Sequence, residues 1–276
     1  MELILLGSGT GIPLNYRASP SLVLVKSGDP VVFDMGPGSL RQLTKAGINF
    51  EQIERIFITH FHPDHTADLI HFLFATRNPY ILKRRRPFVI AGPAGTKKLI
   101  SRLQDSYADC LSLPSEIMTI EEIDVSEKAV KDYPDFELTA CPVMHAPESI
   151  AYRIKDKSGK SFVYSGDTGF CEEIVNLAKG TDLLILECSF PDGNQTEGHL
   201  TPFEAGQVAS LADAKKLVLT HFYPECLRTD ITSQCRRAYE GELILGSDLL
   251  HFSRYIANSH GLVTTTKQQR IQPEGS

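Results

Sequence analysis

The segment FITHFHPDHTADL, residues 57–69, crowds three histidines and an aspartate into six neighbouring positions. The apolar run RIFIT, residues 55–59, is typical of a short buried strand, and apolar residues in 66–77 recur at helical spacing. We therefore expect a strand that turns into a helix. His60 and His62 lie two positions apart, so at the end of a strand their side chains point the same way and can share one metal ion.

Asp64 and His65, which follow the turn-forming Pro63, suit a second ion. They are adjacent in sequence and head into the helix, so they cannot easily join the first coordination sphere. Imidazole and carboxylate ligands without thiolate favour zinc, with manganese or iron as alternatives. Two such ions held together are the usual feature of an open hydrolytic site.

Composition and charge limit the partners and the compartment of the chain. Its 276 residues carry a formal net charge of −6 with a pI near 5.9, which argues against a general electrostatic footprint for nucleic acid. We interpret the basic run KRRRP, residues 83–87, as a solvated, self-repelling face. The six cysteines lack a CxxC pair and are expected to be reduced core residues. No apolar stretch approaches the ~20 residues that span a bilayer, so we expect a cytoplasmic protein without a membrane partner.

Short apolar runs separated by turn residues recur along the chain and predict strands, with helical patterns between several of them. The neighbours 21–26 and 31–34 indicate a hairpin, and hence mixed rather than purely parallel sheets. We expect two packed sheets with helices outside, as a single domain over residues 1–265 with a flexible tail at 266–276. The expected strands are 2–7, 21–26, 30–34, 55–59, 87–92, 136–143, 149–156, 160–167, 182–187, 216–221 and 242–246, and the expected helices are 38–47, 66–77, 94–107, 171–180 and 201–212.

Two ions need more donors than residues 60–65 supply, and polar residues at the ends of other expected strands are the candidates. His145 ends FELTACPVMH, Asp167 ends SFVYSGD and His221 ends KLVLTH, each after a strongly apolar run. Asp34 repeats the pattern in VVFDMGPG, where its carboxylate could orient a ligating imidazole. Each residue alone is equally well explained as the polar cap of a strand. Together with the histidine cluster, they predict one metal-binding rim.

The motifs THFHPDH, VVFDMGPG, SGDTG and LTH, with His145, occur in an order that resembles the metallo-β-lactamase superfamily. The resemblance extends over about residues 1–225, and LLGSGTGIPLNYRASPS and PFVIAGPAG resemble more narrowly its ribonuclease Z-like branch of phosphodiesterases. It implies an α/β fold, an αββα sandwich of two mixed sheets with helices on the outer faces and a two-metal site on its edge. The implied ligands are His60, His62 and His145 on one metal, Asp64, His65 and His221 on the other, and Asp167 bridging both.

Two further segments bear on catalysis and substrate. The ribonuclease Z branch pairs a glutamate and a histidine to help protonate the leaving group, and Glu187 of DLLILECSFPDG and His199 of GHLTP match their places. Transfer-RNA-processing members carry a long arm between the equivalents of His145 and Asp167. Here APESIAYRIKDKSGKSFVYSG fills that gap, which suffices for two strands and a turn. Leu186 stands where those enzymes usually have a histidine, and THFYPE replaces the usual ending of their last motif.

These features predict a hydrolase with a dinuclear zinc site, foremost a phosphodiesterase that uses a metal-bridging hydroxide. Asp64 is expected to orient or deprotonate the nucleophile, and His199, oriented by Glu187, to protonate the leaving alkoxide. The absence of a cysteine ligand favours this activity. We expect a small phosphodiester substrate rather than nucleic acid, and a homodimer is left open. The alternatives are a ribonuclease Z-type transfer RNA 3′ endonuclease, a lactone, thioester or β-lactam hydrolase, and a non-catalytic metal-stabilised binding protein.

Overall fold

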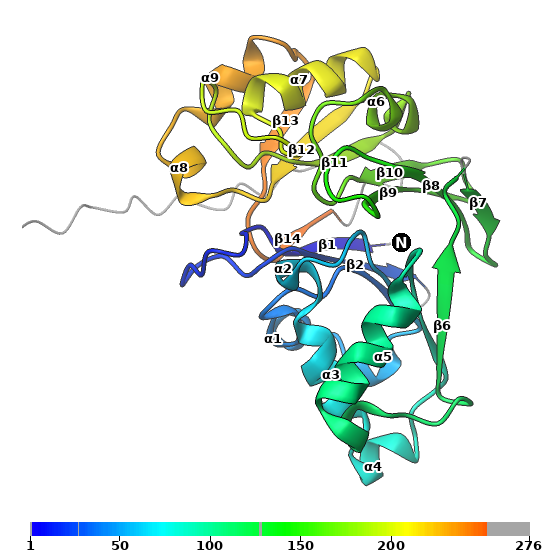
Figure 1. Cartoon of the computed structure of the whole chain (residues 1–276). Helices are drawn as coiled ribbons and strands as arrows, with labels where there is room; N and C mark the ends of the chain where they lie inside the picture. The colour runs from blue at the N-terminus through cyan, green and yellow to red at the C-terminus, as the bar shows by residue number, and fades with distance from the viewer. Residues whose placement is uncertain (1, 27, 127–128, 253–276) are drawn as a thin grey trace, which may run out of the picture.

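The computed structural model describes residues 2–26, 28–126 and 129–252. Two seven-stranded sheets pack face to face, and helices cover both outer faces (Figure 1). The expected αββα sandwich is therefore confirmed. The predicted tail, residues 266–276, lies outside the described residues.

The first sheet contains, in spatial order, β14 (Leu250–His251), β1 (Glu2–Gly7), β2 (Ser21–Lys26), β3 (Asp29–Phe33), β4 (Arg55–Phe57), β5 (Phe88–Pro93) and β6 (Met118–Ile123). The four strands from β14 to β3 pair antiparallel, and β3 to β6 pair parallel. The β2–β3 hairpin and the mixed pairing agree with the sequence expectation. Because β3, β4 and β5 run in the same direction, the segments after them emerge at one edge of the sheet.

The second sheet contains, in spatial order, β13 (Glu242–Leu245), β12 (Lys216–Thr220), β11 (Leu183–Glu187), β10 (Ser161–Tyr164), β9 (Ile150–Asp156), β8 (Phe136–Pro142) and β7 (Ala129–Asp132). The strands from β13 to β10 pair parallel, and those from β10 to β7 pair antiparallel. β9 and β10 form the expected two strands and turn between His145 and Asp167.

The helices are α1 (Ser39–Lys45), α2 (Pro63–Thr66), α3 (Asp68–Thr76), α4 (Pro79–Leu82), α5 (Thr96–Ser106), α6 (Glu172–Ala178), α7 (Pro202–Leu211), α8 (Pro224–Leu227) and α9 (Ile231–Arg236), with 3₁₀ turns at Phe50–Gln52 and Ala108–Leu111. Helices α1, α3 and α5 lie on the side of the first sheet, and α6, α7 and α9 on the side of the second (Figure 1). Their buried side chains join the two outer cores. A capping box between Thr201 and Glu204 fixes the start of α7. Among the described residues, no helix combines the length and apolar character that a membrane span requires.

Strand residues alternate between a core shared by the sheets and an outer core under the helices. In β1, Leu3 packs between the sheets and Ile4 packs toward the helices of the first sheet. In β11, Ile185 packs between the sheets and Leu184 packs under α6 and α7. Strands covered on both faces read as continuous apolar runs, which explains why the sequence reveals them. The single domain over residues 1–265 stays a prediction, and its last positions, 253–265, lie outside the described residues.

Two expectations about strands need correction. β6, β7 and β14 are not expected from the sequence, because these edge strands are short or carry charges such as Glu121 and Lys131 on half-exposed positions. In addition, β8 ends at Pro142 rather than at His145. The backbone N–H of Val143 donates to the carbonyl of Ser149 at 3.0 Å, which turns the chain before the histidine.

The interpretation of KRRRP as a solvated, self-repelling face is correct only in part, because Lys83, Arg84 and Arg86 are exposed but Arg85 is buried. Arg85 is 4% exposed, lies over the Phe88 ring at 4.6 Å and donates to the carbonyl of Ile53 at 2.6 Å. Arg84 binds both carboxylate oxygens of Glu51 at 2.6 Å, and Arg86 pairs with Asp29. The arginines of the basic run therefore fix the loop before β5 to neighbouring parts of the chain. Nearby carboxylates partly neutralise their charges.

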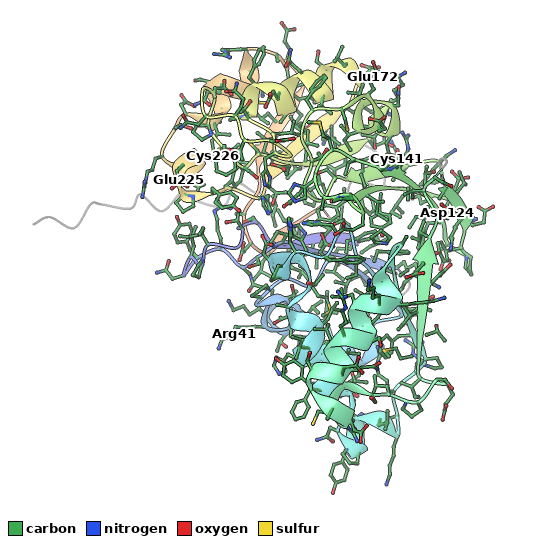
Figure 2. The ribbon with its side chains drawn as sticks, in the orientation of Figure 1. Arg41, Asp124, Cys141, Glu172, Glu225 and Cys226 are labelled. Carbon is green, nitrogen blue, oxygen red and sulfur yellow. The ribbon has the colours of Figure 1, made fainter. Side chains whose placement is uncertain are left out.

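All six cysteines lie in the described part of the chain, and none forms a disulfide, as expected. Four of them are buried, including Cys141 and Cys226, which Figure 2 places in the half of the molecule built on the second sheet. Cys110 is exposed and Cys171 is intermediate, so these two are not core residues.

Candidate metal centre

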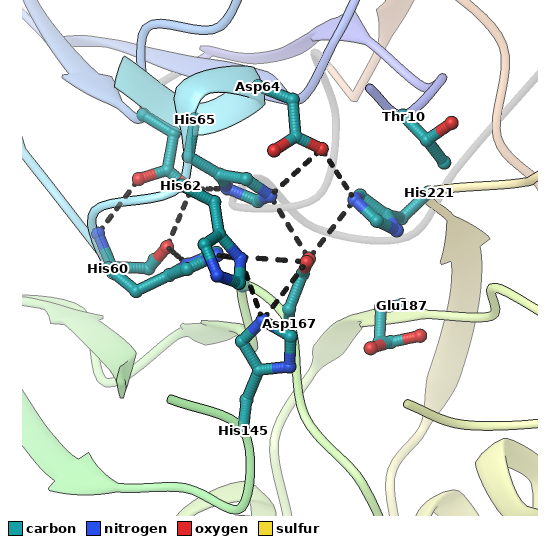
Figure 3. Close-up of polar contacts among 12 residues, drawn as sticks. Thr10, His60, His62, Asp64, His65, His145, Asp167, Glu187 and His221 are labelled. Atoms are coloured by element: carbon teal, nitrogen blue, oxygen red, sulfur yellow. Dashed lines mark hydrogen bonds and ion pairs between the residues drawn. The ribbon is translucent and has the colours of Figure 1, made fainter. Parts of the chain in front are cut away.

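The structure brings every residue predicted for the site to one edge of the sandwich, and Figure 3 labels all of them except Asp34 and His199. The turn between β4 and α3 supplies four side chains, the last residue of β11 supplies Glu187, and loops that follow β3, β8, β10, β11 and β12 supply the rest. The assembled residues are Asp34, His60, His62, Asp64, His65, His145, Asp167, Glu187, His199 and His221.

One group of side chains forms around three imidazoles. Nδ1 of His62 lies 3.1 Å from Nε2 of His60 and 3.0 Å from Nε2 of His145. Oδ2 of Asp167 lies 3.8 Å from Nε2 of His60 and 3.7 Å from Nε2 of His145. Ligand atoms of these four residues all lie within 4.8 Å of one another, so one ion could contact all of them.

The second group contains Asp64, His65 and His221, whose ligand atoms also lie within 4.8 Å of one another. The other oxygen of Asp167, Oδ1, lies 3.1 Å from Nε2 of His65 and 3.2 Å from Nε2 of His221. Asp167 therefore turns one carboxylate oxygen toward each group, which is the arrangement that a bridging ligand requires.

Acceptors behind the histidines fix the tautomers. Oδ2 of Asp34 lies 2.7 Å from Nδ1 of His65, which therefore donates and leaves Nε2 for the centre. Thr59 donates its hydroxyl to Asp34 at 2.8 Å, so it accepts from Nδ1 of His60 at 3.1 Å. The carbonyl of Gly198 accepts from Nδ1 of His145 at 2.9 Å. In each case the ring presents the Nε2 lone pair inward.

Ser189 fixes the tautomer of His221. The sequence does not indicate this role of Ser189, apart from its place two residues after Glu187. The Ser189 hydroxyl donates to Oε2 of Glu187 at 2.6 Å. Since a hydroxyl has one proton, its oxygen accepts from Nδ1 of His221 at 2.9 Å. This buried serine thus connects the second group to the Glu187 carboxylate.

Glu187 and His199 form the pair expected from the sequence. Oε1 of Glu187 lies 2.8 Å from Nδ1 of His199, and among the described residues Nε2 of that ring has no hydrogen-bond partner. Glu187 is 1% exposed and also accepts the backbone N–H groups of Thr168, Ser189 and Leu200. The ring of His199 lies 4.8 Å from that of His145 between centroids, so the histidine borders the centre.

The charges of these groups depend on their neighbours. Burial and the nearby His65 lower the pKa of His60 to about 2, so this imidazole stays neutral and keeps its lone pair. Burial alone would lower the pKa of His65, but Asp167 and Asp34 raise it well above its usual value, so a metal ion that binds Nε2 would have to displace a proton from this ring. Burial would likewise lower the pKa of His199, which the hydrogen bond to Glu187 raises. His199 is therefore suited to carry a proton at neutral pH.

Backbone strain also occurs at this edge. Asp34 follows β3 with φ of 57° and His221 follows β12 with φ of 59°, in a region that residues other than glycine rarely adopt. Such conformations persist where the surrounding structure enforces them, as at functional sites. Gly36 lets its loop approach closely, because a Cβ there would lie 1.9 Å from the carbonyl oxygen of Asp64.

The donor atoms fit metal ions. Nε2 of His65, Oδ1 of Asp167 and Nε2 of His221 are buried, yet have no hydrogen-bond partner among the described residues. Buried polar atoms are normally satisfied, so three convergent exceptions indicate a place for cations. The set consists of imidazoles and carboxylates, which zinc, manganese and iron accept.

Residues 30–222 match the β-lactamase superfamily domain. The ribonuclease Z of Streptomyces avermitilis is 28% identical over 300 aligned positions, which cover 90% of this chain and 96% of that protein. The crystal structure of human tRNase Z, short form, has 27% sequence identity and a TM-score of 0.74, covering 92% of this chain and 99% of that one. The metallo-β-lactamase fold protein YhfI of Bacillus subtilis has a TM-score of 0.78 at 20% identity, covering 91% and 98%. The chain thus belongs to the β-lactamase superfamily, as a metallo-β-lactamase-fold hydrolase with ribonuclease Z relatives.

Proposed function

We propose that this protein is a phosphodiesterase that depends on two divalent metal ions, with zinc as the first candidate. The observation that carries the proposal is the position of Asp167 between two groups of donors, with one oxygen toward each. His60, His62 and His145 would hold one ion, and Asp64, His65 and His221 the other. When bound, such ions supply an activated water and neutralise charge on the phosphoryl oxygens.

The remaining chemistry falls to side chains of this chain. Asp64 is 15% exposed, and its Oδ2 lies 3.5 Å from Nε2 of His221, so it can orient the attacking water at the open side of the centre. His199 holds a proton through its bond to Glu187, and a ring nitrogen of this residue lies within 4.8 Å of ligand atoms of Asp167 and His221. We assign His199 as the donor to the leaving alkoxide, a role typically worth about 10²–10⁴ in rate.

Two features favour a small phosphodiester as substrate. The segment between His145 and Asp167 is occupied by β9, β10 and their turn, which leaves no long arm for a large RNA. The basic run does not substitute for it. Arg86 pairs with Asp29 at the start of β3, whereas Asp34 reaches the centre from the other end of that strand. The end of an RNA strand bound at the metal centre would therefore not contact residues 83–87.

A second candidate function is ribonuclease Z-type cleavage of transfer RNA precursors. It is favoured by the name of the Streptomyces avermitilis relative, which covers 90% of this chain. That alignment runs over 300 positions, whereas 90% of 276 residues is about 248, so about 52 positions have no residue of this chain. A shorter chain in the matched region accords with the loss of a substrate-binding arm.

We expect the protein to hydrolyse a bis-aryl or cyclic phosphodiester with a higher kcat/KM than a precursor transfer RNA with a 3′ trailer. Remote contacts position a large substrate, and this chain lacks the arm that would make them. The panel should include a lactone and a β-lactam, because metal ions polarise carbonyl and phosphoryl groups alike. Efficient cleavage of the precursor at one site would instead establish the processing nuclease, and turnover of none of the four would indicate a binding protein.

Ser189→Ala is expected to weaken metal binding at the second group by about 10–100-fold, the usual effect of losing a residue that orients a ligand. The variant leaves Nδ1 of His221 without its acceptor, so the ring can rotate or change tautomer. The measurement is metal content after titration with a chelator. Ser189→Thr keeps the hydroxyl and should restore retention of the ion. Ser161→Ala removes another buried serine hydroxyl, bonded to Thr181 and Arg153 and outside both donor groups, and should leave metal retention unchanged.

A further inference from the structure

Phe190 and Tyr223 form a stacked aromatic pair beside the candidate proton donor. Their ring centroids are 4.8 Å apart, with 15° between the planes. Phe190 lies just after β11 and Tyr223 just after β12, before α8, whose Glu225 and Cys226 are labelled in Figure 2. The backbone N–H of Tyr223 donates to the carbonyl of Ser189 at 3.3 Å, which holds the two segments side by side.

Both rings lie against His199. The centroid of its ring is 5.6 Å from Phe190 and 6.3 Å from Tyr223, with interplanar angles of 71° and 77°. Tyr223 also lies 5.9 Å from the ring of His221. Phe190 and Tyr223 are each partly exposed, unlike the aromatic residues Phe33 and Phe57 of the core between the sheets. The pair therefore forms a partly open aromatic wall at the rim of a polar centre.

The wall and the proton donor together restrict the leaving group. A proton donor is needed when the group departs as an alkoxide, because an aryl oxide leaves readily without one. An aromatic wall is useful when the ligand carries a ring that can pack on it. A nucleoside meets both conditions, since its sugar oxygen departs as an alkoxide and its base is aromatic.

We propose that Phe190 and Tyr223 bind the base of a nucleoside leaving group and so determine the specificity of the site. The inference rests on the proposed function, because His199 defines the side on which the leaving group departs. A ring bound there would contact an aromatic surface that is already ordered by stacking and by the backbone bond to Ser189. Little conformational freedom would be lost on binding.

The test compares adenosine 3′,5′-cyclic phosphate with methyl riboside 3′,5′-cyclic phosphate, which differ in the base alone. The wild-type protein should show a KM about 10- to 100-fold lower for the base-bearing substrate, in line with the usual strength of base stacking. Tyr223→Leu and Phe190→Leu should remove most of that difference by raising KM while kcat changes little. Tyr223→Phe keeps the ring and should retain the preference. Tyr107→Leu, an exposed tyrosine next to the end of α5, is the control.

A second measurement uses adenosine and methyl riboside as competitors of bis-aryl diester hydrolysis. Adenosine should compete about 10- to 100-fold better with the wild-type protein, but not with Tyr223→Leu. Equal KM values and equal competition in the wild-type protein would overturn the inference and leave the phosphodiesterase intact. If Tyr223→Leu lowered kcat/KM equally for both substrates, the aromatic wall would have a structural role only. Absence of hydrolysis of every diester, with metal bound, would overturn the proposed function and this inference with it.

Discussion

Asp167→Ala is expected to lose the defined spacing of two metal ions and to reduce diester hydrolysis by about 10³-fold or more. Oδ1 of Asp167 faces His65 and His221, and Oδ2 faces His60 and His145, so no other described side chain is placed to join both groups in this way. Metal ions supply several kcal/mol of charge stabilisation in such reactions, and about 1.4 kcal/mol corresponds to tenfold in rate.

Elemental analysis and kcat/KM on one preparation check this prediction. The wild-type protein should contain two ions per chain after metal-replete purification, and the variant fewer. Asp182→Ala is the matched control, because Asp182 is a carboxylate only 8% exposed, which accepts from the backbone of Ser161 away from the centre. This control should keep both ions. Two tightly bound ions and normal turnover in Asp167→Ala would contradict the bridging role.

Most of the fold is predictable because its strands are buried on both faces. β1, β5, β11 and β12 lie between two apolar layers and therefore appear in the sequence as continuous apolar runs. Edge strands do not carry this signal. β7 alternates half-exposed with exposed positions in AVKD, a pattern that does not differ from that of a loop. Its pairing with β8 is a tertiary contact that no local pattern encodes.

The candidate site is likewise only partly predictable from the sequence. The spacing of His60, His62 and His65 is local, and histidines clustered by chance rarely match the spacing of metal ligands, so the sequence reveals this part of the site. Ser189 is an ordinary serine in sequence, and its role follows only from distances to His221 and Glu187. The unexpected burial of Arg85 in the basic run has the same cause: local sequence shows three arginines but not their partners Glu51 and Asp29, which lie more than thirty positions away.

His199→Ala is expected to slow the hydrolysis of diesters with poor alkoxide leaving groups by about 10²–10⁴-fold and that of aryl diesters far less. Glu187 holds Nδ1 of His199 at 2.8 Å and raises the pKa of the ring, so a protonated Nε2 faces the centre. An alkoxide needs that proton as the bond breaks, whereas an aryl oxide is stable without it. The measurement is kcat/KM over a series of leaving groups of increasing basicity.

The control must separate proton donation from metal binding, because ligand atoms of Asp167, His199 and His221 also lie within 4.8 Å of one another. If His199 were a ligand, His199→Ala would lose an ion and slow all diesters equally. If it is the proton donor, the variant keeps both ions and its rate depends more steeply on leaving-group basicity. His251→Ala removes an exposed histidine with a matching 2.8 Å bond from Nδ1 to Glu2, and should change neither quantity. Retained metal with a steeper dependence in His199→Ala alone therefore assigns the proton to this residue.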